Sequence, residues 1–325
     1  MRQCAFRLAL LVATALPMPA SGAQPVDGIP RIGYLLARGP DPNIDDAFSG
    51  GMRELGYVEG KNIVIERRFA QGAFERLPQL VAELIELKVK VIVAAPFPAA
   101  RAAEEATKTI PIVMLTGGDP VAAGLVASLA RPGGNLTGVS NQGADIMPKM
   151  LELLHEMVPA AARIAVLVNP ENPMHDPFRK ELEATARELR IGLVYLKASA
   201  ASDFGSAVAD AMRRGAAGLI VPQDPVFFNQ RARLIELVAH HRLPMMAPFR
   251  EFTTGGGLTS YGRDLREGFR RMAAYVDKIL KGARPGDLPI EQPTQFQLVI
   301  NLKTAKTLGL VLPPAVLVRA DEIIR

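Results

Sequence analysis

Strand-like and helix-like segments alternate along most of the chain, and this alternation limits the possible folds more than any other feature. Arg31–Leu36 and Val89–Ala94 are short apolar runs typical of buried strands. Between them, Asn43–Leu55 carries apolar residues at i, i+3, i+4, i+7, i+8 and i+11, the spacing of one helical face. Strands that alternate with helices form parallel sheets covered on both faces. The sequence therefore predicts an α/β fold.

A segment rich in proline and glycine, Arg131–Asn135, interrupts the alternation and divides it into two parts. About four strand–helix units precede Pro132, and several follow it. This division predicts two Rossmann-like lobes with parallel sheets, whereas a solenoid would need a sequence repeat of ~20–50 residues. Within this scheme we expect helices at Val121–Leu129 and near Arg319–Ile324.

The first residues, Met1–Ala23, have the pattern of a cleavable secretory signal. Two arginines precede the apolar stretch Leu8–Leu16, and small residues lead to a predicted cleavage site before Gln24. An uncleaved membrane anchor is the alternative, although the apolar stretch is short for a ~30 Å hydrocarbon core. We therefore expect an exported, periplasmic protein. The one cysteine, Cys4, lies before the cleavage site and predicts no disulfide.

Residues that commonly carry catalytic chemistry do not form recognisable motifs in this sequence. The nearest approach to a serine nucleophile motif, Gly138–Gln142, lacks its final glycine. The four histidines do not have metal-ligand spacing. The net charge of +5 comes from 38 basic and 33 acidic residues that are mixed along the chain, without a basic run for nucleic acid. We therefore predict no enzyme activity, no cofactor, no metal and no nucleic-acid partner.

The loops after the predicted strands are the expected ligand site, because ligands of parallel α/β sheets bind beyond the carboxyl ends of the strands. Asp119 and Asp224 each lie at such a strand end, directly before a proline. Each could contact a ligand ammonium group, or could cap a helix that has proline at its first position. Nearby aromatic residues could stack on a ring-bearing ligand or fill the core, and core packing is the better explanation for Phe228.

Arg38, Arg101 and Arg250 are candidate partners for a ligand carboxylate, with a solvated surface position as the alternative for each. The complete set of candidate ligand-binding residues is Leu36, Ala37, Phe97, Pro98, Asp119, Asn169, Asn172, Asp224, Phe227, Phe249, Glu251 and Tyr261.

Several longer segments carry a family pattern. They are Gly51–Ile63, Leu125–Gly138, Tyr275–Gly282, Glu291–Thr294 and Leu298–Lys306. Together they resemble the ABC transporter substrate-binding proteins of the tryptophan/tyrosine-type family. The resemblance extends from about Arg31 to Arg325 and concerns mainly the scaffold.

The resemblance implies a type 1 periplasmic-binding-protein fold, in which three hinge crossings join two lobes. The crossings are expected near Thr137–Asn141, Gly255–Leu258 and Arg284–Pro293. The first lobe would then comprise residues 31–137 and 257–284, and the second lobe residues 138–256 and 285–325. The resemblance also implies a membrane permease and an ATPase as partners, and we expect a monomer.

The segment Ala94–Ala100 departs from the family pattern, because family members commonly have a glycine and a hydroxyl residue after this strand. A hydroxyl that could hold a ligand carboxylate is missing, so the ligand could be a ring-bearing acid less polar than an aromatic amino acid. We therefore predict the solute-binding protein of an ABC importer, with a small aromatic or carboxylate-bearing solute between its lobes. A periplasmic sensor of the same fold and an exported α/β hydrolase are the alternatives.

Overall fold

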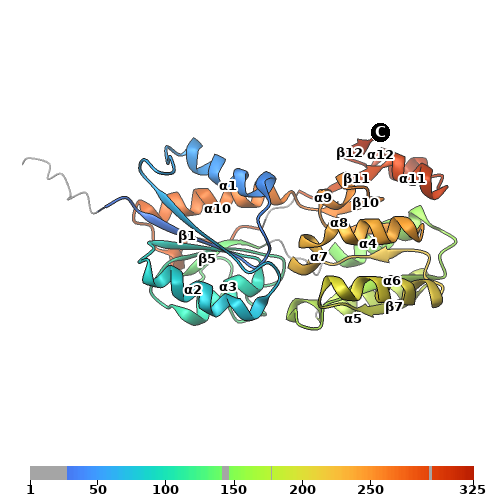
Figure 1. Cartoon of the computed structure of the whole chain (residues 1–325), viewed down its shortest axis with the longest axis horizontal. Helices are drawn as coiled ribbons and strands as arrows, with labels where there is room; N and C mark the ends of the chain where they lie inside the picture. The colour runs from blue at the N-terminus through green and yellow to red at the C-terminus, as the bar shows by residue number, and fades with distance from the viewer. Residues whose placement is uncertain (1–27, 141–145, 177, 293–294) are drawn as a thin grey trace, which may run out of the picture.

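The computed structural model describes residues 28–140, 146–176, 178–292 and 295–325. These residues form two lobes that lie side by side along the long axis of the molecule (Figure 1). Each lobe is a sheet between layers of helices, so the predicted α/β class is confirmed. The predicted secretory signal, Met1–Ala23, lies outside the described residues.

The first lobe contains, within the described part of the chain, a parallel five-stranded sheet in the order β2–β1–β3–β4–β5. The strands are β1 (Arg31–Leu36), β2 (Val64–Phe69), β3 (Val91–Ala95), β4 (Ile112–Thr116) and β5 (Leu136–Ser140). One face is covered by α1 (Pro42–Glu54) and α10 (Leu265–Leu280), which lie beside each other in Figure 1. The other face is covered by α2 (Leu77–Glu86) and α3 (Phe97–Ala106).

Successive residues of the central strand β1 contact opposite faces of this lobe. Ile32, Tyr34 and Leu36 belong to the core formed with α1 and α10, whereas Leu35 belongs to the core formed with α2 and α3. All four side chains are almost completely buried. Each large apolar side chain buried in this way contributes about 1.5–3 kcal/mol. The strand is therefore held from both sides, and its carboxyl end is fixed at the edge that faces the second lobe.

The second lobe contains a seven-stranded sheet, counted over the described residues, in the order β12–β11–β10–β9–β8–β6–β7. Only the pair β10 and β11 is antiparallel in this part of the structure. The strands are β6 (Arg163–Val168), β7 (Gly192–Lys197), β8 (Leu219–Ile220), β9 (Met245–Ala247), β10 (Thr259–Gly262), β11 (Gln297–Asn301) and β12 (Glu322–Ile324).

The helices of the second lobe cover both faces of this sheet. They are α4 (Ile146–Met157), α5 (Phe178–Leu189), α6 (Phe204–Arg213), α7 (Pro225–Asn229), α8 (Arg231–His240), α9 (Arg250–Thr254), α11 (Leu302–Leu308) and α12 (Pro314–Val318). Helices α4 and α5 contribute to one core, and α6 and α8 contribute to the other. Four 3-10 turns occur in the described chain: η1 (Phe74–Arg76), η2 (Pro173–His175), η3 (Ala201–Asp203) and η4 (Pro285–Asp287).

Two predicted helices are wrong. The predicted helix at Val121–Leu129 is a series of turns, because Gly124 adopts a left-handed φ of 71° and the N–H of Leu125 returns to the carbonyl of Pro120. The predicted helix near Arg319–Ile324 is instead the edge strand β12, which pairs in parallel with β11. Its two adjacent isoleucines suit a strand because β-branched side chains favour the pleated conformation.

The chain passes between the lobes later than the predicted lobe boundaries after residues 137, 256 and 284. Strand β5 continues the first sheet to Ser140, beyond the predicted boundary at residue 137. Strand β10 joins the second sheet, although residues 257–284 were assigned to the first lobe. The second passage therefore follows β10, since the glycines at 255–257 form the turn that ends α9. Residues 285–291 stay with the first lobe, where the N–H of Glu291 donates to the carbonyl of Gly138.

Among the described residues, no helix combines the length and the apolar character that crossing a membrane requires.

Candidate functional site

A cavity of about 380 Å³ lies between the two lobes, at the carboxyl ends of β3 and β4 in one lobe and of β6 and β8 in the other. Its volume falls in the range of small-molecule sites. Most of the side chains around it are apolar. The lining residues are Pro96, Phe97, Pro98, Arg101, Gly117, Gly118, Asp119, Ala122, Ala123, Met147, Asn172, Pro173, Met174, His175, Phe178, Pro222, Gln223 and Pro225.

The first lobe contributes the beginning of α3 to this cavity. Pro96, Phe97 and Pro98 form this end of the helix, and the two prolines lack an N–H that could bind an anion. One turn later Arg101 also lines the cavity, with its guanidinium 5.5 Å from the centre of the Phe97 ring. The guanidinium donates a hydrogen bond to the carbonyl oxygen of Ala123. This wall therefore presents an apolar surface with one cationic group.

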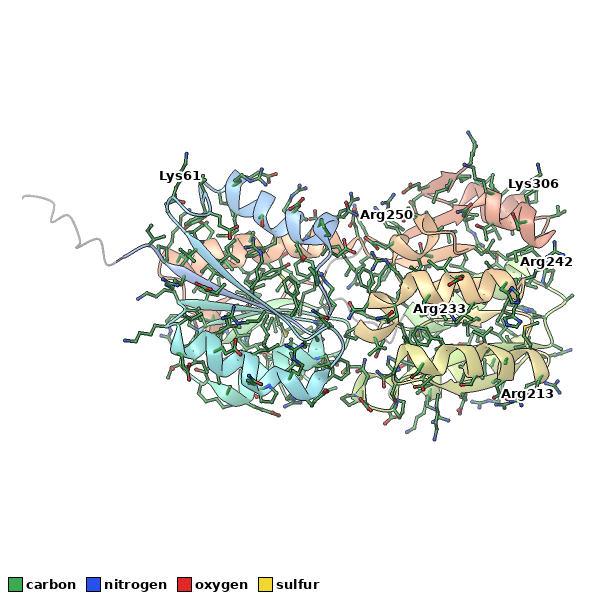
Figure 2. The ribbon with its side chains drawn as sticks, viewed as in Figure 1. Lys61, Arg213, Arg233, Arg242, Arg250 and Lys306 are labelled. Atoms are coloured by element: carbon green, nitrogen blue, oxygen red, sulfur yellow. The ribbon has the colours of Figure 1, made fainter. Side chains whose placement is uncertain are left out.

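The three candidate arginines differ in their partners in the structure. Arg38 is buried and forms an ion pair with Asp45. Arg250 forms an ion pair with Glu322 and lies near the junction of the lobes (Figure 2). Arg101 has no carboxylate within ion-pair distance among the residues that the structure describes. Of the three, Arg101 is the one whose positive charge is left for a ligand in the large cavity.

The second lobe contributes a buried polar cluster, centred on Asp224. One carboxylate oxygen of Asp224 accepts from the N–H groups of Val226 and Phe227, at 2.7 and 3.3 Å, and so caps α7. The other oxygen accepts from the side-chain amides of Asn169 and Asn172, at 3.1 and 2.8 Å. The Asp224 side chain is fully buried. The contacts therefore match the capping interpretation of this residue.

His175 belongs to the same cluster. Its Nδ1 atom accepts a hydrogen bond from the N–H of Asn169 at 2.9 Å, and its Nε2 atom lies 3.1 Å from the carbonyl oxygen of Gln223. These partners assign the neutral tautomer with a proton on Nε2. Burial lowers the pKa of His175 below its ordinary value, although the nearby charge of Asp224 acts in the opposite direction. The imidazole is therefore a neutral part of the wall.

Asp119 lies at the rim of the cavity and is exposed. Its Oδ1 atom accepts from the N–H groups of Val121 and Ala122, at 2.8 and 3.2 Å. The side chain thus caps the turn that replaces the predicted helix.

A second, smaller hollow of about 40 Å³ adjoins the large cavity and shares Pro96, Gln223 and Pro225 with it. Three phenylalanine rings line this hollow, from Phe228, Phe249 and Phe269. Arg38 from the first lobe and Asp224 from the second also line it. Pro96, Gln223 and Pro225 therefore form part of the wall of both spaces.

The predicted candidate residues divide into two groups. Phe97, Pro98, Asp119 and Asn172 line the large cavity, and Asp224 and Phe249 line the small hollow. The other six line neither space: Leu36, Ala37, Asn169, Phe227, Glu251 and Tyr261.

Packing accounts for most of the six residues that line neither space. Leu36 and Ala37 are core residues at the end of β1. Phe227 is completely buried against Phe204, with ring centroids 5.9 Å apart. Tyr261 stacks on Phe296. Asn169, although outside both spaces, holds Asp224 in place.

Glu251 lies on α9, away from both cavities. Burial raises the pKa of its carboxyl group, and the negative charges of Asp264 and Asp41 act in the same direction.

The sequence reasoning missed several lining residues. Met174, His175 and Phe178 come from η2 and the start of α5, and Met147 comes from α4. The position of His175 beyond the end of β6 was the available signal for a site residue. Among the described residues, no group of three histidine, cysteine, aspartate or glutamate side chains is arranged to hold a metal ion.

Contacts outside the cavity also join the lobes. Arg231 of α8 donates from Nη2 to Oδ2 of Asp41 at 2.6 Å, and the N–H of Gly39 donates to Oδ1 of Asn229 at 2.7 Å. Asp41 and Gly39 follow β1 in the first lobe, whereas Arg231 and Asn229 belong to the second. The structure therefore holds the lobes together around the cavity.

Comparison with known proteins places this architecture in context. The family model described as ABC transporter substrate binding protein matches residues 41–324. A tyrosine-binding protein from Clostridioides difficile (strain R20291) is 28% identical over 272 residues, which are 83% of this chain and 78% of that protein.

Solved structures share the fold. A conserved domain protein from Vibrio cholerae has a TM-score of 0.84 and 29% identity, and the match covers 91% of this chain and 100% of that one. An ABC domain in complex with L-Trp from Streptococcus pneumonia has a TM-score of 0.83 and 24% identity over the same shares.

Proposed function

Because the chain belongs to the family of ABC transporter substrate-binding proteins, we propose that it holds a small carboxylate-bearing solute with an aromatic or apolar body between its lobes and delivers this solute to a membrane permease. The family consists of solute-binding proteins and not of enzymes. Its members work outside the cytoplasm. The signal-like pattern of Met1–Ala23 supports export to the periplasm, where the permease and its ATPase would receive the solute.

The observation that carries the ligand class is the combination of an apolar cavity with a cationic group that has no acidic partner among the described residues. Phe97, Phe178 and Met174 supply the apolar surface, and Arg101 supplies the positive charge. A guanidinium favours a carboxylate because it can donate two parallel hydrogen bonds to the two oxygens. The named relatives bind tyrosine and tryptophan, which have a ring and a carboxylate, and this supports a ring-bearing ligand.

Delivery requires that the ligand-bound shape differs from the free shape. A ligand that contacts both lobes binds better when they are together, so it shifts the population toward that arrangement. The cavity has walls from both lobes, which supports this mechanism.

A combined binding and scattering experiment tests the proposal. The chain from Gln24 onward would be screened by thermal shift against aromatic and aliphatic carboxylates, amino acids and sugars. A ligand at about 100 times its Kd stabilises the folded state by about 2.7 kcal/mol, which a thermal shift detects. We expect a carboxylate to bind and to reduce the radius of gyration. Selective binding of an uncharged sugar, or an unchanged radius at saturation, would contradict the proposal.

A further inference from the structure

The buried carboxylate of Asp224, in the polar wall of the second lobe, has no hydrogen-bond acceptor position left for a ligand. Asp224 accepts four hydrogen bonds, two at each oxygen, from Val226, Phe227, Asn169 and Asn172. A carboxylate offers about four acceptor positions. A ligand ammonium group therefore finds no open position on Asp224 unless it displaces a donor that belongs to the protein.

The neighbours of Asp224 supply no second negative charge. The amide oxygens of Asn169 and Asn172 accept from the N–H groups of Glu171 and Met174, at 3.0 and 3.2 Å. Both nitrogens of the neutral His175 ring have partners in the protein backbone. These three residues carry no charge, so none of them can balance a buried ammonium group.

Asp119 is the acidic group at the rim of the large cavity, and it is exposed to water. An ammonium group near it stays hydrated and gains little, because exposed ion pairs are weak. Buried charges need a partner, since their removal from water is costly. Among the residues that the structure describes, the interior of the cavity therefore offers a partner to an anion, at Arg101, and no charged partner to a cation.

From this asymmetry, and resting on the proposed function, we infer that the cavity selects ring-bearing or branched apolar carboxylates that lack an ammonium group, in preference to the amino acids that have the same side chains. The carboxylate contacts Arg101 on the first lobe. The apolar body lies against Phe97, Met174 and Phe178.

Matched ligand pairs test this inference. 3-Phenylpropanoate and L-phenylalanine differ only in the α-ammonium group, and so do 3-(4-hydroxyphenyl)propanoate and L-tyrosine. Calorimetry on the mature chain would measure the Kd of all four compounds. We expect each acid to bind at least about tenfold more tightly than its amino acid.

Two variants separate the role of the charge from packing. Arg101→Met keeps an apolar side chain of similar length, and it should weaken binding of the acids about tenfold or more. Arg179→Met is the control, because Arg179 also stacks on an aromatic ring, that of Tyr195, but lies outside the cavity. It should leave the Kd unchanged.

The outcomes distinguish the selectivity against amino acids from the binding of a solute. If an amino acid binds as tightly as its acid or more tightly, the inference is overturned while solute binding stands. If Arg101→Met leaves the affinity for the acids unchanged, the inference is also overturned. If neither member of either pair binds, both the inference and the ligand class under the proposed function fail.

Discussion

Replacement of Arg231 by methionine should shift the protein toward an arrangement in which the lobes are separate. The guanidinium of Arg231 bridges the lobes, because it donates to Asp41 of the first lobe at 2.6 Å and to the carbonyl of Phe228 in its own lobe at 3.0 Å. It also lies 4.4 Å from the centre of the Phe228 ring. None of these atoms touches the space where a ligand would bind in the large cavity.

The expected loss of ligand affinity follows from the burial of the pair formed by Asp41 and Arg231. The side chain of Asp41 is 6% exposed and that of Arg231 is 28% exposed, so the pair is partly shielded from water. A hydrogen bond to a charged group contributes about 1.5–3 kcal/mol. The loss applies only while the lobes are together, since separation returns Asp41 to water. We therefore expect ligand affinity to fall by roughly ten- to a hundredfold, at 1.4 kcal/mol for each factor of ten.

The distance between two spin labels, one on each lobe, reports how far apart the lobes lie in the ligand-free protein. Cys4 is the only cysteine in the sequence and precedes the predicted cleavage site, so new cysteines at Lys61 and Lys306 would be labelled selectively. Figure 2 shows these two side chains on opposite lobes. Arg233→Met is the control, because Arg233 is on the same helix but pairs with Glu236 of its own lobe. A label distance that is the same in Arg231→Met and in the wild type would refute the reasoning.

Two further predictions concern the site. Gly117→Ala should weaken ligand binding about two- to fivefold without lowering the unfolding temperature of the free protein, because a Cβ atom there would lie 2.1 Å from Oε1 of Gln223 in the other lobe, and the end of this flexible side chain can move at a smaller cost than the about 1–3 kcal/mol of overpacking a fixed core. Gly134→Ala, with nothing within 4 Å, is its control, and equal binding by the two variants would contradict the explanation. Stability should fall as the pH drops below the ordinary His pKa of ~6.5, because burial lowers the folded-state pKa of His175 and the unfolded chain then binds a proton first. Thermal unfolding between about pH 7.5 and pH 5 should show a smaller loss in His175→Gln than in the wild type, and the exposed His240→Gln should behave as the wild type does.

The fold could be predicted from the sequence because periodic burial determines most of it. In β1 and β3 every residue except Arg31 is buried, as strands covered on both faces require. Helix α10 has a regular apolar stripe and a capping aspartate, Asp264, which accepts from the N–H of Arg266. The short helix α7 was not predictable in this way. Helix α7 is five residues long, too short to display a period, and its only signal was Asp224 followed by proline.

The location of the large cavity could also be predicted, but the chemistry of its walls could not. The rule that ligands bind beyond the carboxyl ends of parallel strands identified loops that do surround the cavity. The rule could not show which side chains point into the cavity. Phe227 and Phe228 are adjacent on α7, yet Phe227 is in the core beside Phe204 and Phe228 lines the small hollow. Similarly, nothing in the sequence reveals that Arg38 has an acidic partner, whereas Arg101 has none in the part of the chain that the structure describes.

Asp224 shows why an acidic residue at a strand end can be either a ligand contact or a helix cap in this fold. The carboxyl end of a parallel strand is where ligands bind, and it is also where the next helix begins with N–H groups that have no partner. The two roles compete for the same oxygens, and the helix of the protein is always present whereas the ligand is not. Here two asparagines after β6 complete the shell around the carboxylate. An acid followed by proline and faced by amide side chains from the next strand end is therefore expected to support the wall of a site. Direct ligand contact would then fall to a charged residue that has no oppositely charged partner among the described residues, and Arg101 is the residue that we propose for this role in the large cavity.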